Sequence, residues 1–172
     1  DVEAPGISKE QAFVKVFKMA QDRFKTQNDD RGRILYQDID EGTVVCWGEE
    51  YLVFTQKALV LDRATMLYQV SYTCREGGCS MEVSRIRYTY GESPKPIYAE
   101  EWITDKHAYD KKRNRLIRGS DKFRIKTIDL VEELQELLKK TLEIPANAGQ
   151  VGSENGVLPV PVLKHTLSAE VM

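Results

Sequence analysis

Apolar residues recur at every third or fourth position near both ends of the chain, and this spacing predicts two amphipathic helices. Residues 9–25 form the first predicted helix, and Ser8 and Gln11 make a capping box at its start. The second helix is expected to begin at Asp129, which makes a capping box with Glu132. The predicted apolar faces are Ala12, Phe13, Val16, Phe17, Ala20 and Phe24, then Leu130, Val131, Leu134, Leu137, Leu138 and Leu142.

Between the helices, apolar and polar residues alternate, which predicts antiparallel strands. The clearest alternation covers residues 66–74. Folding the chain at the turn 75–78 places Cys74 opposite Cys79 and keeps the apolar residues of both strands on one face. The apolar positions then change phase, which predicts a β-bulge near Arg85 and a curved sheet.

Shorter β segments precede this hairpin. Residues 33–38 and 43–47 flank an Asp-Glu-Gly turn and are expected to form a hairpin. Residues 51–54 and 58–61 are brief apolar runs around a polar link, and we expect them to be separate strand fragments.

Near the C-terminal helix, residues 115–118 and 122–127 flank Gly-Ser-Asp and predict one more hairpin. The order helix, antiparallel strands, helix is typical of an α+β fold, with a curved antiparallel sheet packed on one face by an N-terminal and a C-terminal helix. We assign residues 1–145 to a single domain. Residues 146–172 are rich in Gly, Asn, Pro and Val and predict an extended C-terminal tail.

Composition agrees with one folded domain, since 41% of the 172 residues are hydrophobic and 30% are charged. No apolar stretch approaches the roughly 20 residues of a membrane helix, so no transmembrane segment is expected. The net charge of −2 gives no overall attraction to nucleic acid or to anionic membranes.

Positive charge is concentrated in residues 106–126, which contain nine Lys or Arg and two Asp. One interpretation is a solvated hairpin whose cations keep an edge strand from pairing with other sheets. Another is a site for an anionic envelope component. Nucleic acid is not an expected partner, because few aromatic residues in this segment could stack on bases. The candidate anion-binding residues are Lys111, Lys112, Arg113 and Arg115.

Cys74 and Cys79 are candidates for a disulfide. Directly opposed positions that are not hydrogen-bonded to each other have Cα atoms about 4.5 Å apart, which a disulfide can bridge. The alternative is a pair of reduced thiols. Cys46 lies among apolar residues and is interpreted as a buried structural cysteine.

Other residues suggest contacts rather than chemistry. The acidic turn at residues 38–41 fits ordinary turn formation better than a calcium loop, and Trp102 fits a core anchor better than a ligand platform. We assign no catalytic, cofactor-binding or metal-binding residue and expect no cofactor. If the sheet leaves one face uncovered, tyrosines on that face would form a contact surface. The candidates are Tyr68, Tyr72, Tyr88 and Tyr90.

Three stretches resemble a known family: ILYQDIDEGTVV, VSYTCREGGCSMEVSRIRYTY and EEWITDKHAYDKKRNRLIRGSDKFRIKTIDL. The family is domain of unknown function 4468, described as having a TBP-like fold and found mostly in exported proteins of Bacteroidetes. The resemblance covers residues 8–142 and implies a curved antiparallel sheet backed by helices. It also implies a periplasmic or cell-envelope location, with the leader sequence absent from this chain. It implies no activity.

These observations give three hypotheses. The first is an exported, non-catalytic module that binds a ligand or a partner, either a protein or an envelope component, through its exposed sheet face or edge, with the tail as a docking strand. The second is an accessory domain with a structural or assembly role, which would include self-association through the sheet edge or the tail. The third is an enzyme with a carboxylate-based site.

Overall fold

The computed structural model describes residues 1–24, 31–57, 60–93 and 95–143. The predicted tail, including the docking strand proposed for it, lies outside these residues. In chain order the elements are β1 (Val2–Glu3), α1 (Lys9–Phe24), β2 (Gly32–Asp38), β3 (Thr43–Lys57), β4 (Val60–Arg75), β5 (Gly78–Tyr90), β6 (Ile97–Tyr98), α2 (Ala99–Trp102), α3 (Asp105–Ala108), β7 (Tyr109–Asp110), β8 (Arg115–Leu116) and α4 (Asp121–Glu143).

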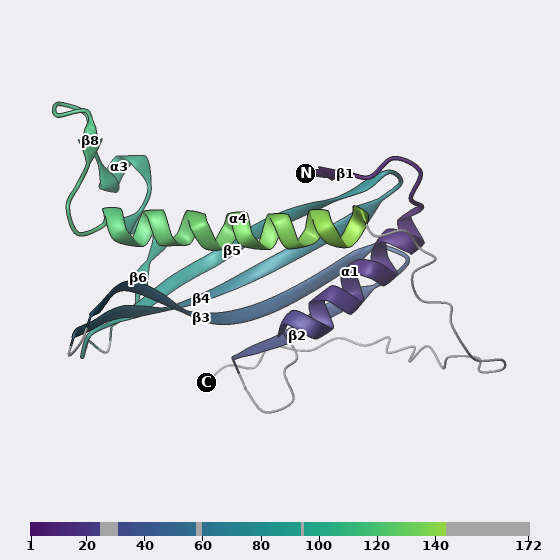
Figure 1. Ribbon diagram of the computed structural model, residues 1–172, viewed down its shortest axis with the longest axis horizontal. Helices are drawn as coiled ribbons and strands as arrows, with labels where there is room; N and C mark the ends of the chain where they lie inside the picture. The colour runs from purple at the N-terminus through teal and green to yellow at the C-terminus, as the bar shows by residue number, and fades with distance from the viewer. Residues whose placement is uncertain (25–30, 58–59, 94, 144–172) are drawn as a thin grey trace.

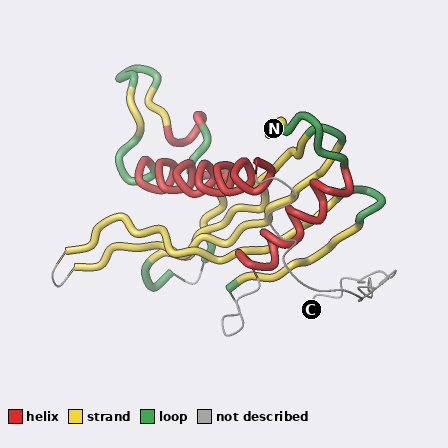
Figure 2. Tube along the Cα trace, turned by 45° about the vertical axis from the view of Figure 1, so that its right-hand side comes forward, coloured by secondary structure: helices red, strands yellow, loops and turns green. Residues whose placement is uncertain are grey.

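The fold has two layers, an antiparallel sheet and a pair of helices. The sheet has the strand order β1-β5-β4-β3-β2. β1 pairs with the start of β5, and β6 pairs with its end along the same edge. Both α1 and α4 lie across the same side of this sheet (Figures 1 and 2). The predicted α+β architecture is therefore confirmed. No helix among the described residues is long and apolar enough to cross a bilayer.

The hydrophobic core lies between the helices and the sheet. In β4, every second residue from Ala64 to Cys74 is buried, and these residues point toward the helices. The helices contribute Val16 from α1 and Leu134 and Leu138 from α4, all almost fully buried. The alternation along the strands and the helical spacing thus converge on one apolar layer.

The start of α1 is fixed by the predicted capping box. The backbone N–H of Gln11 donates to Ser8 Oγ at 3.2 Å, and the backbone N–H of Ser8 donates to Gln11 Oε1 at 3.0 Å. These two bonds satisfy N–H groups that have no partner within the helix.

The start of α4 was predicted wrongly. The helix begins at Asp121, so residues 122–127 form its first turns and are no hairpin arm. The alternation of Phe123 and Thr127 with charged residues suggested a strand, but both side chains also fit the helical spacing that leads to Leu130. The structure uses the helical period, and the two residues are buried while Ile125 between them is exposed.

The strand fragments predicted at residues 51–54 and 58–61 are parts of longer strands where the structure describes them. Residues 51–54 lie within β3 and residues 60–61 begin β4, and these strands pair from Thr43 opposite Thr73 to Lys57 opposite Val60. Residues 58–59 lie outside the described residues. The polar residues that interrupt the apolar pattern are accommodated within the strand. Glu50, for example, accepts hydrogen bonds from Arg23 of α1 at 2.5 Å and from the Tyr68 hydroxyl at 3.2 Å.

The predicted hairpin at residues 33–38 and 43–47 and the register of the β4–β5 hairpin are confirmed. Cys74 pairs with Cys79 in the β4–β5 hairpin. The predicted bulge is present as well. The pairing shifts by one residue between Ser84 and Arg87, and Arg85 has a left-handed backbone with φ of 52°. The bulge restores the inward direction of the following apolar residues.

Candidate binding surface

The side of the sheet that faces away from α1 and α4 is lined by the alternate residues of its strands. In β3, Val44 and Cys46 are fully buried against the helices, whereas Val45 and Trp47 point to the other side and are partly exposed. We call this side the open face, because no described helix lies on it (Figure 2). Its defining residues are Arg33, Val45, Trp47, Glu49, Tyr51, Val53, Arg63, Leu67, Gln69, Glu82 and Arg87.

On the open face, two aromatic residues of β3 are in contact with arginine side chains. The Arg33 guanidinium lies 5.6 Å from the centre of the Trp47 ring. The Tyr51 ring is contacted by two guanidiniums, Arg31 at 5.4 Å and Arg63 at 4.2 Å. Cation–π contacts at such exposed sites are worth about 0.5–1 kcal/mol each and orient the guanidinium planes. The open face therefore presents positioned cations beside half-exposed rings.

The charge of the open face is positive, unlike the charge of the whole chain. Among its defining residues, Arg33, Arg63 and Arg87 contribute three positive charges, and Glu49 and Glu82 contribute two negative ones. Guanidinium groups stay charged at all physiological pH values and bind carboxylates through two parallel hydrogen bonds. The surface is thus suited to carboxylate groups.

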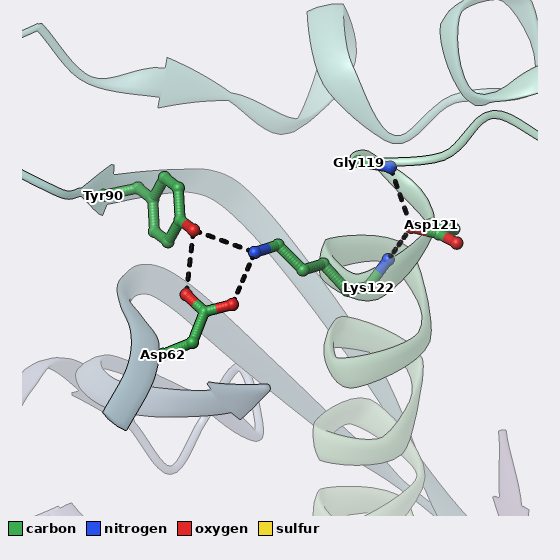
Figure 3. A network of polar contacts seen from close by, with 5 residues as sticks. All are labelled: Asp62, Tyr90, Gly119, Asp121 and Lys122. Atoms are coloured by element: carbon green, nitrogen blue, oxygen red, sulfur yellow. Dashed lines mark hydrogen bonds and ion pairs between the residues drawn. The ribbon is translucent and has the colours of Figure 1, made fainter. Parts of the chain in front are cut away.

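On the helix side, a polar triad joins the start of α4 to the sheet (Figure 3). Lys122 Nζ donates to Asp62 Oδ2 at 2.8 Å and to the Tyr90 hydroxyl at 2.9 Å. The Tyr90 hydroxyl in turn donates to Asp62 Oδ1 at 2.8 Å. Amine, phenol and carboxylate are therefore mutually paired.

The triad is held in its charged state. The hydrogen bond from Lys122, followed by that from Tyr90, lowers the pKa of the Asp62 carboxyl. Partial burial alone would lower the pKa of the Lys122 ammonium, yet its bonds to Asp62 and Tyr90 raise it. The ammonium also lies 4.4 Å from the centre of the Phe54 ring. This pairing fits a clamp between α4 and the sheet and leaves no acid–base group poised for proton transfer.

The candidate anion-binding residues lie on the β7–β8 hairpin, which projects beyond the start of α4 (Figure 1). Lys111 and Lys112 line a shallow cavity of about 550 Å³, together with Asp105 and Asp110. Arg113 and Arg115 do not line it, and Arg113 lies 3.7 Å from the Asp110 carboxylate. The structure thus brings two of the four residues to one cavity, where acidic groups accompany them.

The candidate tyrosines, whose face the sequence left open, do not lie on the open face. Tyr68, Tyr72 and Tyr88 are buried under the helices, and the Tyr90 hydroxyl belongs to the triad. The Tyr88 hydroxyl shares a hydrogen bond of 2.7 Å with Thr127 of α4, and burial raises the pKa of Tyr88 to about 12.

Sequence reasoning missed the aromatic residues that do lie on the open face. Trp47 and Tyr51 occupy β3 positions that alternate with Val44, Cys46 and Leu52. Once the apolar Val44 and Cys46 are placed in the core, Trp47 must point the other way. The alternation of side chains along β3 is therefore a sequence signal that places Trp47 on the open face.

The cysteines occupy buried positions. Cys74 Sγ and Cys79 Sγ lie 3.5 Å apart across the β4–β5 hairpin. Cys46 is fully buried, and burial raises the pKa of its thiol to about 12. This placement agrees with the structural interpretation of Cys46.

The acidic turn between β2 and β3 is explained by local hydrogen bonds. Asp38 Oδ1 accepts from the backbone N–H of Glu41 at 2.9 Å, and the Tyr36 hydroxyl donates to Glu41 at 2.9 Å. Within the described ranges, no group of three or more His, Cys, Asp and Glu side chains is arranged to hold a metal ion.

Trp102 is about one-third exposed and makes an edge contact with Phe123, with 6.2 Å between the ring centres.

Comparison with known proteins agrees with the geometry. The strand order and the paired helices define an α+β domain with a TBP-like fold. The model of the family "Domain of unknown function (DUF4468) with TBP-like fold" matches residues 1–89, from β1 to almost the end of β5. The chain belongs to this family. The stretch at residues 100–130 that also suggested the resemblance lies beyond the matched residues.

Two crystal structures are similar to the chain. A DUF4468 family protein from Bacteroides ovatus is 36% identical, with a TM-score of 0.77 and coverage of 84% of each chain. A TBP-like protein from Parabacteroides distasonis is 20% identical, with a TM-score of 0.69 and coverage of 83% of this chain and 89% of that chain. The second similarity concerns the fold alone. No curated protein matches the chain.

Proposed function

We propose that this protein is a non-catalytic binding module of the cell envelope, and that its open face binds an acidic segment of a partner protein. The proposal rests on the arginines that stack on Trp47 and Tyr51, with their guanidinium carbons 4.2–5.6 Å from the ring centres. The rings supply apolar contact area, and the guanidiniums supply carboxylate recognition.

The position of these residues supports the proposal. Trp47 and Tyr51 lie on the central part of the sheet and on the same face, about 13 Å apart along the strand. Because β3 and β4 are hydrogen-bonded on both sides, the backbone that carries them is rigid. An extended segment of four or five residues could span both rings and meet Arg33 and Arg63 along the way.

The cell-envelope location is a separate part of the proposal. Its support is the resemblance to a family found mostly in exported proteins. Fractionation of cells that express the complete gene tests it. Detection of the protein in the periplasmic or membrane fraction is the expected result, and a protein found only in the cytosol would refute this part.

Binding is tested with poly-L-glutamate, an acidic probe that is unstructured at neutral pH. The Trp102→Phe variant leaves Trp47 as the single tryptophan, so that fluorescence reports on the open face. We expect saturable quenching or a spectral shift at low salt, which weakens as the salt rises from about 50 to 300 mM because exposed charges are screened. No signal with poly-L-glutamate would refute the proposal, as would binding of heparin in its place.

Matched charge removals locate the site. Arg33→Gln combined with Arg63→Gln should weaken binding at least about tenfold, since a hydrogen bond to a charged group is worth about 1.5–3 kcal/mol. Lys111→Gln combined with Lys112→Gln removes the same charge from the β7–β8 hairpin and should leave binding unchanged. The reverse pattern would assign binding to the hairpin and its cavity and contradict the open-face proposal.

A further inference from the structure

The two cysteines at the end of the β4–β5 hairpin lie where a cross-strand disulfide fits the backbone. Cys74 and Cys79 are directly opposed, one pair inward from the Arg75–Gly78 pair that closes the turn. The backbone N–H of Cys74 donates to the carbonyl of Gly42 at 2.7 Å, so it points away from β5. Opposed pairs of this kind have Cα atoms about 4.5 Å apart, inside the range that a disulfide bridges.

The side chains agree with the backbone. The two sulfur atoms lie 3.5 Å apart, and a small rotation of either side chain brings them to bonding distance. Cys46 has no such neighbour in the register, because it pairs with Val70 and Ile34. The geometry therefore selects one pair among the three cysteines.

We infer that Cys74 and Cys79 are a redox-active pair that forms an intramolecular disulfide by exchange with a small disulfide such as oxidised glutathione. The Cys74 thiolate attacks the small disulfide, releases one thiol and forms a mixed disulfide. The Cys79 thiolate then attacks the Cys74 sulfur and releases the second thiol. The protein loses two protons and two electrons, and the small disulfide gains them and becomes two thiols.

The N-terminal strand controls access to this pair. Cys74 is 2% exposed and Cys79 is fully buried, and Val2 of β1 pairs with Cys79. A Cβ atom on Gly78 would lie 2.3 Å from the Val2 carbonyl oxygen, so glycine is needed for this close approach. Because β1 has two residues and lies at the edge of the sheet, it opens more readily than the central strands. Exchange is therefore expected to follow opening of β1.

The disulfide would stabilise the end of the sheet that anchors α1. The Gly77 N–H donates to the carbonyl of Ile7 at 3.0 Å, and the Lys9 N–H donates to Glu76 Oε1 at 3.0 Å. A covalent link between residues 74 and 79 restricts the conformations of the unfolded chain and so lowers its entropy. The chain-entropy argument then predicts a melting temperature higher by roughly 4–8 °C in the oxidised protein.

Thiol counting on the full chain tests the inference. The protein is equilibrated with oxidised and reduced glutathione, both folded and during refolding, and free thiols are alkylated and counted by mass spectrometry. We expect a fall from three free thiols to one, with peptide mapping that links Cys74 to Cys79. The Cys46→Ser variant should still form the link, and Cys74→Ser should not lose two thiols.

Three outcomes would overturn the inference: three free thiols under both conditions, a link that includes Cys46, or stable mixed disulfides with glutathione on the unmodified sequence. Access through β1 has its own test. Arg75 pairs with Glu3 of β1, so Glu3→Gln should speed exchange by roughly 1.5- to 5-fold. Glu10→Gln on α1 is the matched control and should leave the rate unchanged. Equal rates for both variants would refute the role of β1.

Discussion

The covered and open faces of the sheet carry aromatic residues for different reasons. On the covered face, Tyr68 and Tyr88 are about 1% exposed or less, and their hydroxyls are paired with Glu50 and Thr127. On the open face, Tyr51 is 43% exposed and its ring is stacked with arginines. The first arrangement excludes water and stabilises the fold. The second leaves ring and charge accessible to another molecule.

The comparison also separates two roles of charge. Lys122 on the helix side is paired with a carboxylate and a phenol and joins α4 to the sheet. Arg33 and Arg63 on the open face lie against aromatic rings, which orient a guanidinium without neutralising it. Substitutions on the two faces should therefore affect different properties.

The largest expected effect is a cavity on the covered face. Leu138→Ala removes a fully buried side chain between α4 and the sheet and should lower the free energy of unfolding by about 2–5 kcal/mol. Leu61→Ala is the matched control on the other side of the sheet, where the side chain is 55% exposed, and should cost less than about 1 kcal/mol. Urea denaturation measures both values. Equal losses would mean that the two sides are packed alike.

The buried tyrosines should respond next, and in opposite directions. Tyr88→Phe leaves the buried Thr127 hydroxyl with only a weak contact to Met66 Sδ, at 3.9 Å, and should cost about 1–3 kcal/mol. The Tyr72 hydroxyl is buried and has no hydrogen-bond partner among the described residues, so Tyr72→Phe should be neutral or stabilising by up to about 1 kcal/mol. Thermal and urea unfolding of both variants check this difference. A loss at Tyr72 as large as that at Tyr88 would contradict it.

The sequence predicted most of the covered face because its signal is periodic. Alternation along residues 66–74 gave the β4–β5 register, and the change of phase gave the bulge at Arg85. Periodicity also caused the wrong prediction of where α4 begins, because Phe123 and Thr127 fit the spacing of both a strand and a helix. Only packing against the sheet selects the helix.

The candidate site was less predictable. The open face depends on which side of the sheet the helices cover, and a single strand does not reveal that side. The sequence therefore left the face of the candidate tyrosines open, and the structure places them on the covered side. The stacking of Arg31 and Arg63 on Tyr51 joins residues that are distant in the sequence or lie on different strands, so it follows only from the β2–β3–β4 register. The parity of Trp47 relative to Cys46 was the one local signal available.

A smaller effect is expected from the charge of the triad. The pKa of Asp62 is lowered below its ordinary value of 3.8 in the folded protein, so its ion pair stabilises the fold above that pH. As the pH falls through the lowered pKa, protonation of Asp62 removes this contribution. The difference in melting temperature between the unmodified protein and Asp62→Asn should be constant from about pH 6 to 8 and should shrink below about pH 4.

The Lys122→Met background supplies the control, because the main partner that lowers the pKa of Asp62 is then absent. In that background, the difference in melting temperature caused by Asp62→Asn should no longer shrink in the same way as the pH falls. A difference that persists undiminished at low pH, or one that is the same in both backgrounds, would show that the triad does not act through this ion pair.

The smallest effect on stability and the largest on binding are expected at the same residues. The triple variant Arg33→Gln, Arg63→Gln and Trp47→Ala should keep the free energy of unfolding within about 1–2 kcal/mol of the unmodified protein, because these side chains are partly exposed. Isothermal titration with poly-L-glutamate should show loss of at least tenfold in affinity. Unchanged affinity in a folded triple variant would contradict the account, and so would unfolding of that variant, since the open face would then be part of what holds the fold together.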